Sequence, residues 1–375
     1  MKAVDEKTIA FTGGGTGGHV YPGLAVAGAL REKGFCGRIV WLGSKKKSDR
    51  APVEGAGLEF IALPSGKLRR ELSLKNVADA FCVLVGYIAA RRELKKLAPA
   101  LLFSKGGYVS VPPCAAAASL RIPYFTHESD LTPGLATRLN AKRAERVVLS
   151  YEATRALLPE AARGRAVVMG NPVRAEIRHG ERAKGRALLG LDKDLSVRDL
   201  PVIFFLGGSQ GARQVNQLVA ETLSRLTERA FVLHQGGPST SPAAGSANSR
   251  YRFYQYIREE MPDLLASADL VVGRSGAGTL WESAALAKPM LLIPLCGSGT
   301  RGDQVDNAEL FVRGGAAISL VGNEATADVL AAEALRLIGD AKRLSEMGQA
   351  AAALAGRDAA SEIADLILHR IGEAP

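Results

Sequence analysis

Two glycine-rich segments of this chain have the residue types and the spacing to act on a phosphorylated substrate. Residues 13–18 (GGGTGG) follow the apolar run 8–12 (TIAFT), and residues 207–211 (GGSQG) follow the apolar run 201–206. Each pattern predicts a strand, a glycine turn and a helix start, which together bring backbone N–H groups close to phosphate oxygens. Two such loops predict two nucleotide-type halves that face one ligand, and hence an enzyme that transfers a group from a nucleotide-activated donor.

His19 follows the first glycine loop directly, and we expect it in the first turn of the helix that begins near residue 20. The positive end of a helix dipole disfavours an imidazolium cation, so a neutral imidazole that can accept a proton is expected there. We therefore predict that His19 takes the proton of an attacking hydroxyl. The alternative is a structural histidine that caps its own helix or hydrogen-bonds a neighbouring loop.

A dehydrogenase is the competing interpretation of the first loop. A dinucleotide-binding G-x-G-x-x-G loop is usually followed by an acidic residue at the end of the next strand. The next predicted strand, residues 38–44 (RIVWLGS), offers no acidic residue. Hydride transfer is therefore the less favoured reaction.

The remaining sequence supplies the elements that position these loops. Short apolar runs such as 38–42, 167–169 and 291–294 alternate with longer Ala- and Leu-rich stretches in a chain of 375 residues with 47% hydrophobic content. This rhythm predicts an α/β fold with parallel sheets and helices on both faces, and the length predicts two domains. The polar and charged run 175–198, which follows residues 170–174 (GNPVR), marks the expected break between them.

The four cysteines, Cys36, Cys82, Cys114 and Cys296, are widely spaced, and no C-x-x-C pair occurs. Neither a disulfide framework nor a zinc site is expected. No run of about 18 uncharged apolar residues occurs, and the first residues lack a basic region followed by an apolar core, so neither a membrane-spanning helix nor a signal peptide is expected. We therefore expect a cytoplasmic protein.

The basic residues, which give the chain a net charge of +10, cluster around one apolar stretch. Residues 66–70 and 91–96 bracket the apolar run 78–90. A helix of this composition could lie on an anionic membrane surface, with its cations near the headgroups. The alternative is an ordinary core helix with solvated ends. Nucleic acid is not an expected partner, because no recognisable nucleic-acid-binding motif accompanies the charge.

Six segments of the chain occur in the order typical of the MurG family of N-acetylglucosaminyltransferases, which the chain resembles over about residues 8–345. The segments are residues 13–27 (GGGTGGHVYPGLAVA), 104–112 (SKGGYVSVP), 127–130 (HESD), 170–174 (GNPVR), 207–213 (GGSQGAR) and 274–282 (RSGAGTLWE).

This resemblance implies the GT-B fold, with two Rossmann-like domains whose parallel sheets face a central cleft. It implies an N-terminal acceptor- and membrane-facing domain at 1–172, to which a C-terminal helix at 355–375 returns, and a C-terminal UDP-sugar-binding domain at 173–354. The implied reaction is inverting transfer of N-acetylglucosamine from UDP-N-acetylglucosamine to the 4-hydroxyl of a polyprenyl-diphosphate muramoyl-pentapeptide. This step, from lipid I to lipid II, belongs to peptidoglycan synthesis, on which cell shape and division depend. It implies a peripheral location at the cytoplasmic face of the cell membrane.

Two other functions stay open. One is a glycosyltransferase that uses the same donor on another lipid, such as diacylglycerol, and the other is a non-catalytic nucleotide-sugar sensor. Transfer that depends on His19 separates an enzyme from a sensor, and a panel of acceptors separates the two enzymes.

The resemblance also implies roles for residues of the donor site. Glu282 would accept the ribose hydroxyls, the backbone of Ile257 would contact uracil, and Gln304 would contact the hydroxyls of the sugar. Carboxylate and amide groups suit the first and third of these roles. The further donor residues are Thr16, Gly17, Gly18, Asp130, Arg174, Ser209, Ala277, Gly278, Thr279, Leu280 and Trp281.

Asp130 follows the predicted strand 123–126, at the strand end where open α/β sheets bind ligands. Members of the family usually have Asn at this position, and the residue is implied to contact the donor sugar. The change replaces an amide that donates and accepts with a carboxylate that only accepts. It also makes Asp130 a competitor of His19 for the role of the base.

Backbone N–H groups, Ser209 and Arg174 are expected to neutralise the leaving uridine diphosphate. Other glycosyltransferases use a divalent metal on an Asp-x-Asp pair, but the pair at 192–194 lies in a predicted surface loop. We therefore expect no metal and no cofactor, with UDP-N-acetylglucosamine as the donor substrate. The acceptor diphosphate is expected at glycines of the first half and a neighbouring tyrosine, namely Gly14, Gly15, Gly106, Gly107 and Tyr108.

Overall fold

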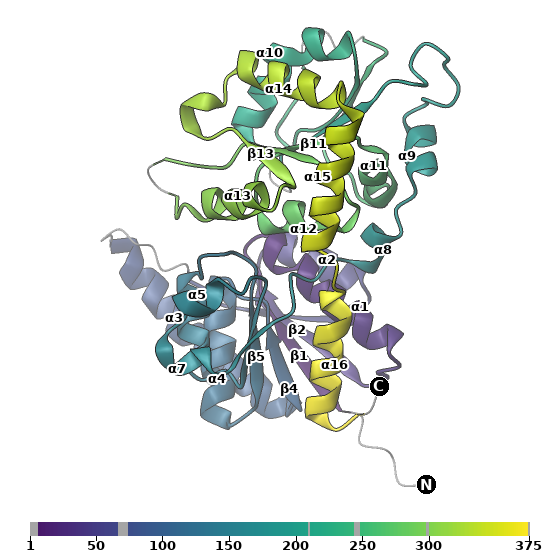
Figure 1. Cartoon of the computed structure of the whole chain (residues 1–375). Helices are drawn as coiled ribbons and strands as arrows, with labels where there is room; N and C mark the ends of the chain where they lie inside the picture. The colour runs from purple at the N-terminus through teal and green to yellow at the C-terminus, as the bar shows by residue number, and fades with distance from the viewer. Residues whose placement is uncertain (1–6, 67–73, 209–210, 244–247, 298–299, 374–375) are drawn as a thin grey trace. The chain divides into compact units, whose positions relative to one another are not determined.

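The computed structural model describes residues 7–66, 74–208, 211–243, 248–297 and 300–373. The chain divides into two compact units, which are coloured along the sequence in Figure 1. The first unit is formed by Met1–Arg174 with Arg357–Pro375, and the second by Ala175–Gly356. These divisions lie next to the breaks expected after residues 172 and 354.

The first unit is built on a seven-stranded parallel sheet in the order β3-β2-β1-β4-β5-β6-β7. Its strands are β1 (Thr8–Thr12), β2 (Arg38–Ser44), β3 (Glu59–Leu63), β4 (Leu101–Ser104), β5 (Tyr124–Glu128), β6 (Arg146–Leu149) and β7 (Ala166–Val168). The inner strands are continuous buried runs, because helices cover both faces of a parallel sheet. In β1, for example, Ile9, Ala10 and Phe11 are all fully buried.

Helices pack on both faces of this sheet. They are α1 (Tyr21–Glu32), α2 (Lys47–Gly55), α3 (Leu74–Leu97), α4 (Val111–Leu120), α5 (Leu135–Asn140), α6 (Thr154–Leu157), α7 (Glu160–Arg163) and α16 (Ala359–Ile371). One core joins Phe11 of the sheet to Leu30 of α1 and Ile367 of α16. A second core joins Leu102 of the sheet to Leu94 of α3 and to α4.

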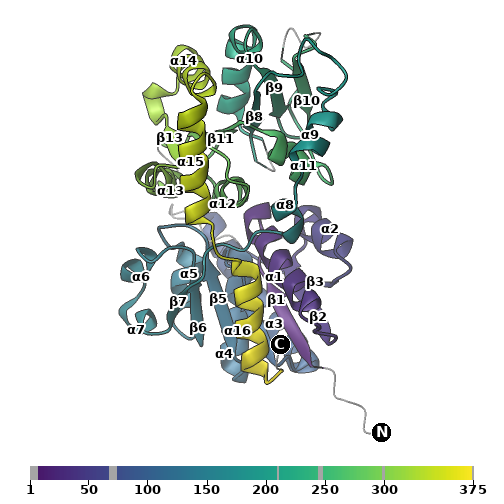
Figure 2. The same cartoon turned by 45° about the vertical axis from the view of Figure 1, so that its right-hand side comes forward.

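The C-terminal helix α16 packs against α1 of the first unit (Figure 2). Ile363 and Ile367, spaced by one helical turn, are fully buried in this contact. Asp358 caps the helix by accepting the N–H of Ser361 at 3.2 Å. The apolar face that the sequence shows at 363–371 therefore has its docking surface in the first unit.

The second unit is built on a six-stranded parallel sheet in the order β10-β9-β8-β11-β12-β13. Its strands are β8 (Val202–Leu206), β9 (Phe231–Gln235), β10 (Tyr251–Tyr254), β11 (Leu270–Gly273), β12 (Met290–Leu292) and β13 (Ala317–Ser319). Its helices are α8 (Ala175–Arg178), α9 (Arg182–Leu188), α10 (Arg213–Thr227), α11 (Met261–Ser267), α12 (Ala277–Ala285), α13 (Asp303–Arg313), α14 (Ala327–Ile338) and α15 (Ala341–Leu354).

In each sheet the strand order reverses at the first strand of the unit. β1 lies between β2 and β4, and β8 lies between β9 and β11. Open α/β sheets bind ligands at such a reversal, beyond the carboxyl ends of the strands. The loops after β1, β4, β8 and β11 all carry motifs that the sequence singled out. The predicted α/β class with two Rossmann-like, parallel-sheet domains is confirmed, while the predicted cleft between them stays a prediction.

Candidate active site

The glycine loop after β1 closes on a buried carboxylate. Gly15, with φ of 91°, donates its N–H to both carboxylate oxygens of Asp49, each at 2.9 Å. The Ser44 hydroxyl donates to the same carboxylate at 2.5 Å. A Cβ at Gly14 would lie 2.4 Å from Asp49 Oδ2, so the approach of the loop requires glycine there. Sequence reasoning missed Asp49, because a pairing across 34 residues leaves no local signal.

The position of the Asp49 carboxylate also tests the alternative that the first glycine loop belongs to a dehydrogenase. Asp49 lies in the first turn of α2, the helix that follows β2, close to where a dinucleotide-binding fold places its ribose acid. It is fully buried, and the glycine loop itself occupies its oxygens. The position therefore gives no support to hydride transfer.

The loop after β4 meets the first glycine loop. Gly106 and Gly107 have φ of 86° and 76°, which glycine adopts without strain. A Cβ at Gly107 would lie 2.8 Å from His19 Cδ2 and 2.9 Å from the Gly14 carbonyl oxygen. Only glycine therefore lets the two loops and the imidazole lie in contact.

Tyr108 begins the short 3-10 turn η2 (Tyr108–Ser110) and covers the first loop. A Cβ at Gly15 would lie 2.5 Å from Tyr108 Cε1, and the Lys46 ammonium lies 5.8 Å from the centroid of the tyrosine ring. A cation over an aromatic face is a favourable contact. The structure thus brings the predicted acceptor residues together beside a cation; they are Gly14, Gly15, Gly106, Gly107 and Tyr108.

His19 ends the 3-10 turn η1 (Gly17–His19), which also contains two of the predicted donor residues, and Thr16 precedes that turn. The α-helix begins only at Tyr21, so the expectation that His19 lies in the first helical turn is wrong. Pro22 accounts for this start, since it lacks an N–H and is preferred in the first helical positions. The imidazole is half-buried against Gly107, next to the predicted acceptor loops.

The segment 127–130 (HESD) begins with the last two residues of β5 and continues into the loop, and only its last residue, Asp130, is partly exposed. His127 is fully buried, and its Nε2–H donates to the Gly170 carbonyl oxygen at 3.0 Å. Burial, and next to it the charge of Lys105, lowers the pKa of His127 well below its usual value, so this imidazole is neutral. Asp130 is therefore the residue of this motif that is open to a substrate.

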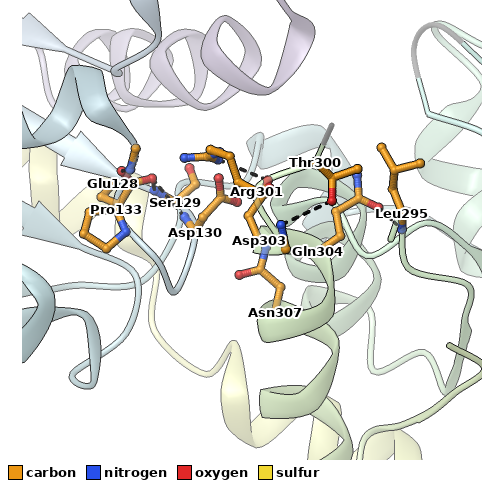
Figure 3. Close-up of polar contacts among 12 residues, drawn as sticks. Glu128, Ser129, Asp130, Pro133, Leu295, Thr300, Arg301, Asp303, Gln304 and Asn307 are labelled. Carbon is orange, nitrogen blue, oxygen red and sulfur yellow. Dashed lines mark hydrogen bonds and ion pairs between the residues drawn. The ribbon is translucent and has the colours of Figure 1, made fainter. Parts of the chain in front are cut away.

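Glu128 shapes the loop that carries Asp130. Its carboxylate accepts the N–H groups of Ser129, Asp130 and Gly134 at 2.9, 3.1 and 3.0 Å. Figure 3 labels Glu128, Ser129 and Asp130 in this loop. Burial, and next to it the charge of Asp130, raises the pKa of Glu128. The backbone donors oppose this rise because they favour the ionised form. The shape of the loop thus depends on the charge of a buried acid.

Lys105 is a second buried charge here that sequence reasoning missed. It follows β4, is only 1% exposed, and donates from Nζ to the Ser129 hydroxyl. That hydroxyl donates in turn to Asn171 Oδ1 at 2.7 Å. Burial lowers the pKa of Lys105 to about 8, and the charges of Glu128 and Asp130 oppose this shift. The sequence signal that could have indicated this residue is the position of Lys105 between the apolar run of β4 and two glycines.

Arg174 is the last residue of the first unit before the chain enters the second. Its guanidinium carbon lies 4.9 Å from the ring centroid of Tyr21, the first residue of α1. This stacking places a cation beside the turn that ends at His19. Arg174, which is predicted to contact the donor diphosphate, is therefore held by a residue of the first unit.

The glycine loop after β8 leads into the N-terminus of a 15-residue helix, α10, which begins at Arg213. Gly208 and Gly211 have φ of 74° and 79°. A Cβ at Gly211 would lie 2.4 Å from the Gly236 carbonyl oxygen, whereas a Cβ at Gly208 would meet no atom of the described residues within 4 Å. The N–H groups in the first turn of such a helix favour an anion. Ser209 lies outside the described residues.

The loop after β11 is tied to the starts of two neighbouring helices. Ser275 Oγ donates to the Gln304 carbonyl oxygen at 2.6 Å, and Asn307 Nδ2 donates to the Ser275 carbonyl oxygen at 3.4 Å. Arg274 donates to Gln214 Oε1 of α10 at 3.0 Å. The N-termini of α10, α12 and α13 are therefore held together at one edge of the second sheet.

Helix α12 begins directly after this loop, with Gly276 as its N-cap and residues 277–279 in its first turn. Glu282 is partly exposed one turn further on. Leu280 and Trp281 are buried in the core, so a contact of these two residues with the donor would come from backbone atoms.

Gln304 and Ile257 are already engaged by neighbours within the second unit. Gln304 Oε1 accepts the N–H of Leu295 at 3.0 Å (Figure 3), which leaves the Nε2 amide as the group for a sugar hydroxyl. The N–H of Ile257 donates to Gln235 Oε1 at 3.0 Å. A uracil bound here would therefore meet the Ile257 carbonyl oxygen or the amide of Gln235, a residue that the sequence did not indicate.

Within the described ranges, no group of three or more His, Cys, Asp or Glu residues is placed to hold a metal ion. The Asp-x-Asp pair, Asp192 and Asp194, is exposed. Asp194 accepts the hydroxyl and the N–H of Ser196 at 2.7 and 2.8 Å, and these bonds lower its pKa. The pair is a solvated turn in the second unit.

Comparison with known families matches both units. The glycosyltransferase family 28 N-terminal domain matches residues 9–149, and the glycosyltransferase family 28 C-terminal domain matches residues 202–363. A protein of Treponema denticola is 44% identical over 96% of this chain and 97% of its own length. A protein of Shouchella clausii is 40% identical over 88% of this chain and 91% of its own length. Both are named UDP-N-acetylglucosamine--N-acetylmuramyl-(pentapeptide) pyrophosphoryl-undecaprenol N-acetylglucosamine transferase.

Solved structures share the fold. The crystal structure of Acinetobacter baumannii MurG matches with a TM-score of 0.71 and 24% identity, over 97% of this chain and 99% of that one. The calicheamicin glycosyltransferase CalG4 matches with a TM-score of 0.67 and 15% identity, over 98% and 99% of the two chains. These similarities show that the two parallel-sheet units form a glycosyltransferase fold of the GT-B type.

Proposed function

The chain belongs to the MurG family of glycosyltransferase family 28, and from this premise we propose how its residues divide the work of transfer. It is an N-acetylglucosaminyltransferase, which moves N-acetylglucosamine from UDP-N-acetylglucosamine to the lipid-linked muramoyl-pentapeptide and so converts lipid I to lipid II. The observation that carries this function is the 44% identity over 96% of the chain to a relative of that name. Neither a diacylglycerol acceptor nor a sensor role is favoured.

A transfer assay with the purified full-length chain tests this function. Labelled UDP-N-acetylglucosamine and a short-chain lipid muramoyl-pentapeptide should yield a labelled disaccharide lipid and one UDP for each sugar transferred. Release of UDP without a disaccharide lipid, or label that appears only on diacylglycerol, would contradict the assignment.

We propose that the chemistry is a single inverting displacement. The 4-hydroxyl oxygen of the muramoyl sugar attacks the anomeric carbon of the donor, the bond from that carbon to the diphosphate oxygen breaks, and UDP leaves with the electron pair. His19 takes the hydroxyl proton. This role of His19 is supported by the position of its imidazole, which lies against Gly107 and beside the loops proposed to bind the acceptor. Asp130, in the loop after β5, is the competing base.

The donor is proposed to bind mainly to the second unit. The N-terminus of α10 and the glycines before it suit the diphosphate, and Glu282 suits the two ribose hydroxyls. Gln304 would offer its Nε2 amide to a sugar hydroxyl, and the hydrogen-bonded Gln235–Ile257 pair is proposed to contact the base. Four of the donor residues proposed in the first unit lie near His19. Gly17 and Gly18 belong to the turn that ends at His19, Thr16 precedes that turn, and Arg174 stacks on Tyr21 just after it.

We propose that transfer needs neither a bound metal nor a cofactor. Helix N-terminal N–H groups and the Arg174 guanidinium would neutralise the departing uridine diphosphate. The exposed Asp192 and Asp194, which are the sequence's Asp-x-Asp pair, face solvent as a hydrogen-bonded turn and are not needed for this task.

A peripheral position on an anionic membrane, at its cytoplasmic face, is proposed from α3. Phe81, Leu84 and Ile88 are 66%, 54% and 59% exposed, and their spacing places them along one side of the helix. The opposite side packs in the core through Leu94 and Ala90. Exposed apolar residues of this size in a row are typical of a helix that lies in a membrane interface. No helix among the described residues is long and apolar enough to cross a bilayer.

Basic residues continue this surface. Arg91, Arg92 and Lys95 line a groove of about 580 Å³ together with Tyr87, Ile88 and Ser119 of α4. Cations beside an apolar strip attract anionic headgroups, at about 1 kcal/mol for each Lys or Arg near the surface. Of the other predicted basic segment, residues 67–70 lie outside the described residues. The sequence left a core helix and a membrane helix open, and the exposed apolar side chains of α3 support the second.

Vesicle sedimentation tests the membrane proposal. The wild-type chain should bind vesicles that contain phosphatidylglycerol, and the double variant Phe81→Ser/Ile88→Ser should bind about tenfold or more weakly, because two apolar side chains no longer insert. The control variant is Leu195→Ser, which changes an 83% exposed leucine of the second unit. Equal binding by the double variant and the control would contradict the proposal.

A further inference from the structure

Three charged groups lie together where β4 and β5 end. Lys105 follows β4, Glu128 ends β5, and Asp130 follows two residues later. β4 and β5 are neighbouring parallel strands, paired from Leu102 to Ser104, so their ends meet at one edge of the sheet. A lysine that is 1% exposed is rare in proteins unless a charge partner accompanies it.

Side-chain hydrogen bonds join Lys105 to two further segments of the chain. Its ammonium donates to the Ser129 hydroxyl, between the two acids in sequence, and Ser129 donates to Asn171 Oδ1 at 2.7 Å. Asn171 belongs to the segment after β7. The Lys105 ammonium therefore holds the loop after β5 through a side-chain hydrogen bond to Ser129. The Glu128 carboxylate holds the same loop by accepting backbone N–H groups of the loop.

The charges of this cluster sum to −1 when Lys105 is protonated and to −2 when it is not. Two carboxylates one residue apart, of which Glu128 is buried, repel each other strongly in a low dielectric. β5 carries two more titratable groups. His127 is neutral and bonded to the Gly170 carbonyl oxygen, and His19 lies within electrostatic reach of His127 from the loop after β1. The buried Tyr124 hydroxyl donates to the Asn140 carbonyl oxygen at 2.6 Å. The Lys105 ammonium therefore places a positive charge next to this pair of acids.

We propose that Lys105 is a positioning residue for sugar transfer, which holds the Asp130 loop through Ser129 and balances the charge of the Glu128–Asp130 pair. The inference rests on the proposed function, in which Asp130 contacts the donor sugar or serves as the base. It predicts that Lys105 and Asp130 are energetically coupled, because the need for the cation arises from the second carboxylate. A purely structural lysine would not show this dependence on residue 130.

A double-mutant cycle in the full-length chain tests the coupling. The variants are Lys105→Met, Asp130→Asn and Lys105→Met/Asp130→Asn, and the double variant keeps the wild-type charge of −1. The readouts are kcat in the transfer assay and the Kd of UDP-N-acetylglucosamine by calorimetry, with circular dichroism to confirm folding. Lys288→Met is the matched control, since Lys288 is a partly buried lysine that donates to the carbonyl oxygens of Ala266 and Ala268 in the second unit.

In the wild-type background, Lys105→Met should raise the Kd of the donor or lower kcat about tenfold. In the Asp130→Asn background, the same substitution should change either quantity about threefold or less. Its pH dependence should change as well. The pKa of Lys105 is about 8, so wild-type activity should fall as the pH rises through 8, and Lys105→Met should lack that fall. Lys288→Met should show no coupling to Asp130.

An equal loss from Lys105→Met in both backgrounds, with an unchanged pH profile, would overturn the inference and leave Lys105 a structural residue. Failure of the wild-type chain to use the lipid acceptor would contradict the proposed function instead. In that case the cycle in donor Kd still decides whether Lys105 and Asp130 are coupled.

Discussion

The loops after β1 and after β8 occupy the same position in their sheets and differ in how their backbone is used. In the first, the N–H of Gly15 is taken by the buried Asp49 carboxylate, and a 3-10 turn delays the helix. In the second, a Cβ at Gly208 would meet no described atom within 4 Å, and the 15-residue helix α10 begins at Arg213. A loop whose donors are internally satisfied suits a fixed base, and a loop that ends in a helix N-terminus suits a departing anion.

The largest expected effect concerns the base on the first loop. His19→Ala should lower kcat by about 100-fold or more, because general-base catalysis contributes a factor on the order of 10² to 10⁴. The KM for the donor should change much less. The measurement is steady-state transfer with the lipid acceptor, and His179→Ala, an exposed histidine of the second unit, is the control. Turnover of His19→Ala within a few-fold of wild type would remove His19 from this role and favour Asp130.

The second prediction compares the room that each loop leaves for a side chain. Gly15→Ala should destabilise the protein by about 3 kcal/mol or more, because φ is positive and the new Cβ would overlap Tyr108. Gly208→Ala should cost only about 1 to 2 kcal/mol, since its φ is positive but no atom of the described residues lies within 4 Å of the new Cβ. Urea denaturation of both variants measures the difference. Equal costs would show that the first loop is not closed as described.

The ribose contact of the second unit should show a smaller effect. Glu282→Gln should raise the KM for UDP-N-acetylglucosamine about tenfold, the loss expected when a charged hydrogen-bond acceptor is replaced by a neutral one. kcat should stay close to wild type. Glu346→Gln, on the exposed surface of α15, is the matched control. A Glu282→Gln enzyme with an unchanged KM would place the ribose elsewhere.

The smallest expected effect is that of metal removal. Excess chelator should leave kcat within about twofold, because helix N–H groups and Arg174 are proposed to neutralise the leaving diphosphate. The assay is repeated after dialysis and after the return of Mg²⁺ or Mn²⁺. Activity that is lost and then restored by one equivalent of a divalent ion would argue against a metal-independent mechanism.

Local sequence patterns were sufficient to predict the parallel α/β architecture and its glycine loops. Apolar runs followed by glycines report strand ends directly, as at Thr12 and Leu206, where two of the four candidate loops begin. The same patterns could not show which side of α12 faces the core, and the predicted donor residues Leu280 and Trp281 are buried there.

The supporting residues of the site were beyond sequence analysis for a different reason. Asp49 reaches Gly15 across 34 residues, and Gln235 reaches Ile257 across 22. Lys105 precedes the two glycines to which the sequence analysis assigned the acceptor diphosphate, and it received no role itself. Its burial depends on β4 and β5, which meet only in the folded sheet. Each of these residues is defined by a long-range partner rather than by its neighbours in the chain.

A crystal structure of the protein with UDP-N-acetylglucosamine bound tests most directly whether the two loops differ in function. We expect the diphosphate at the N-terminus of α10, the ribose at Glu282 and the sugar within reach of Gln304. A diphosphate found instead on the loop that Asp49 closes, after β1, would contradict this expectation.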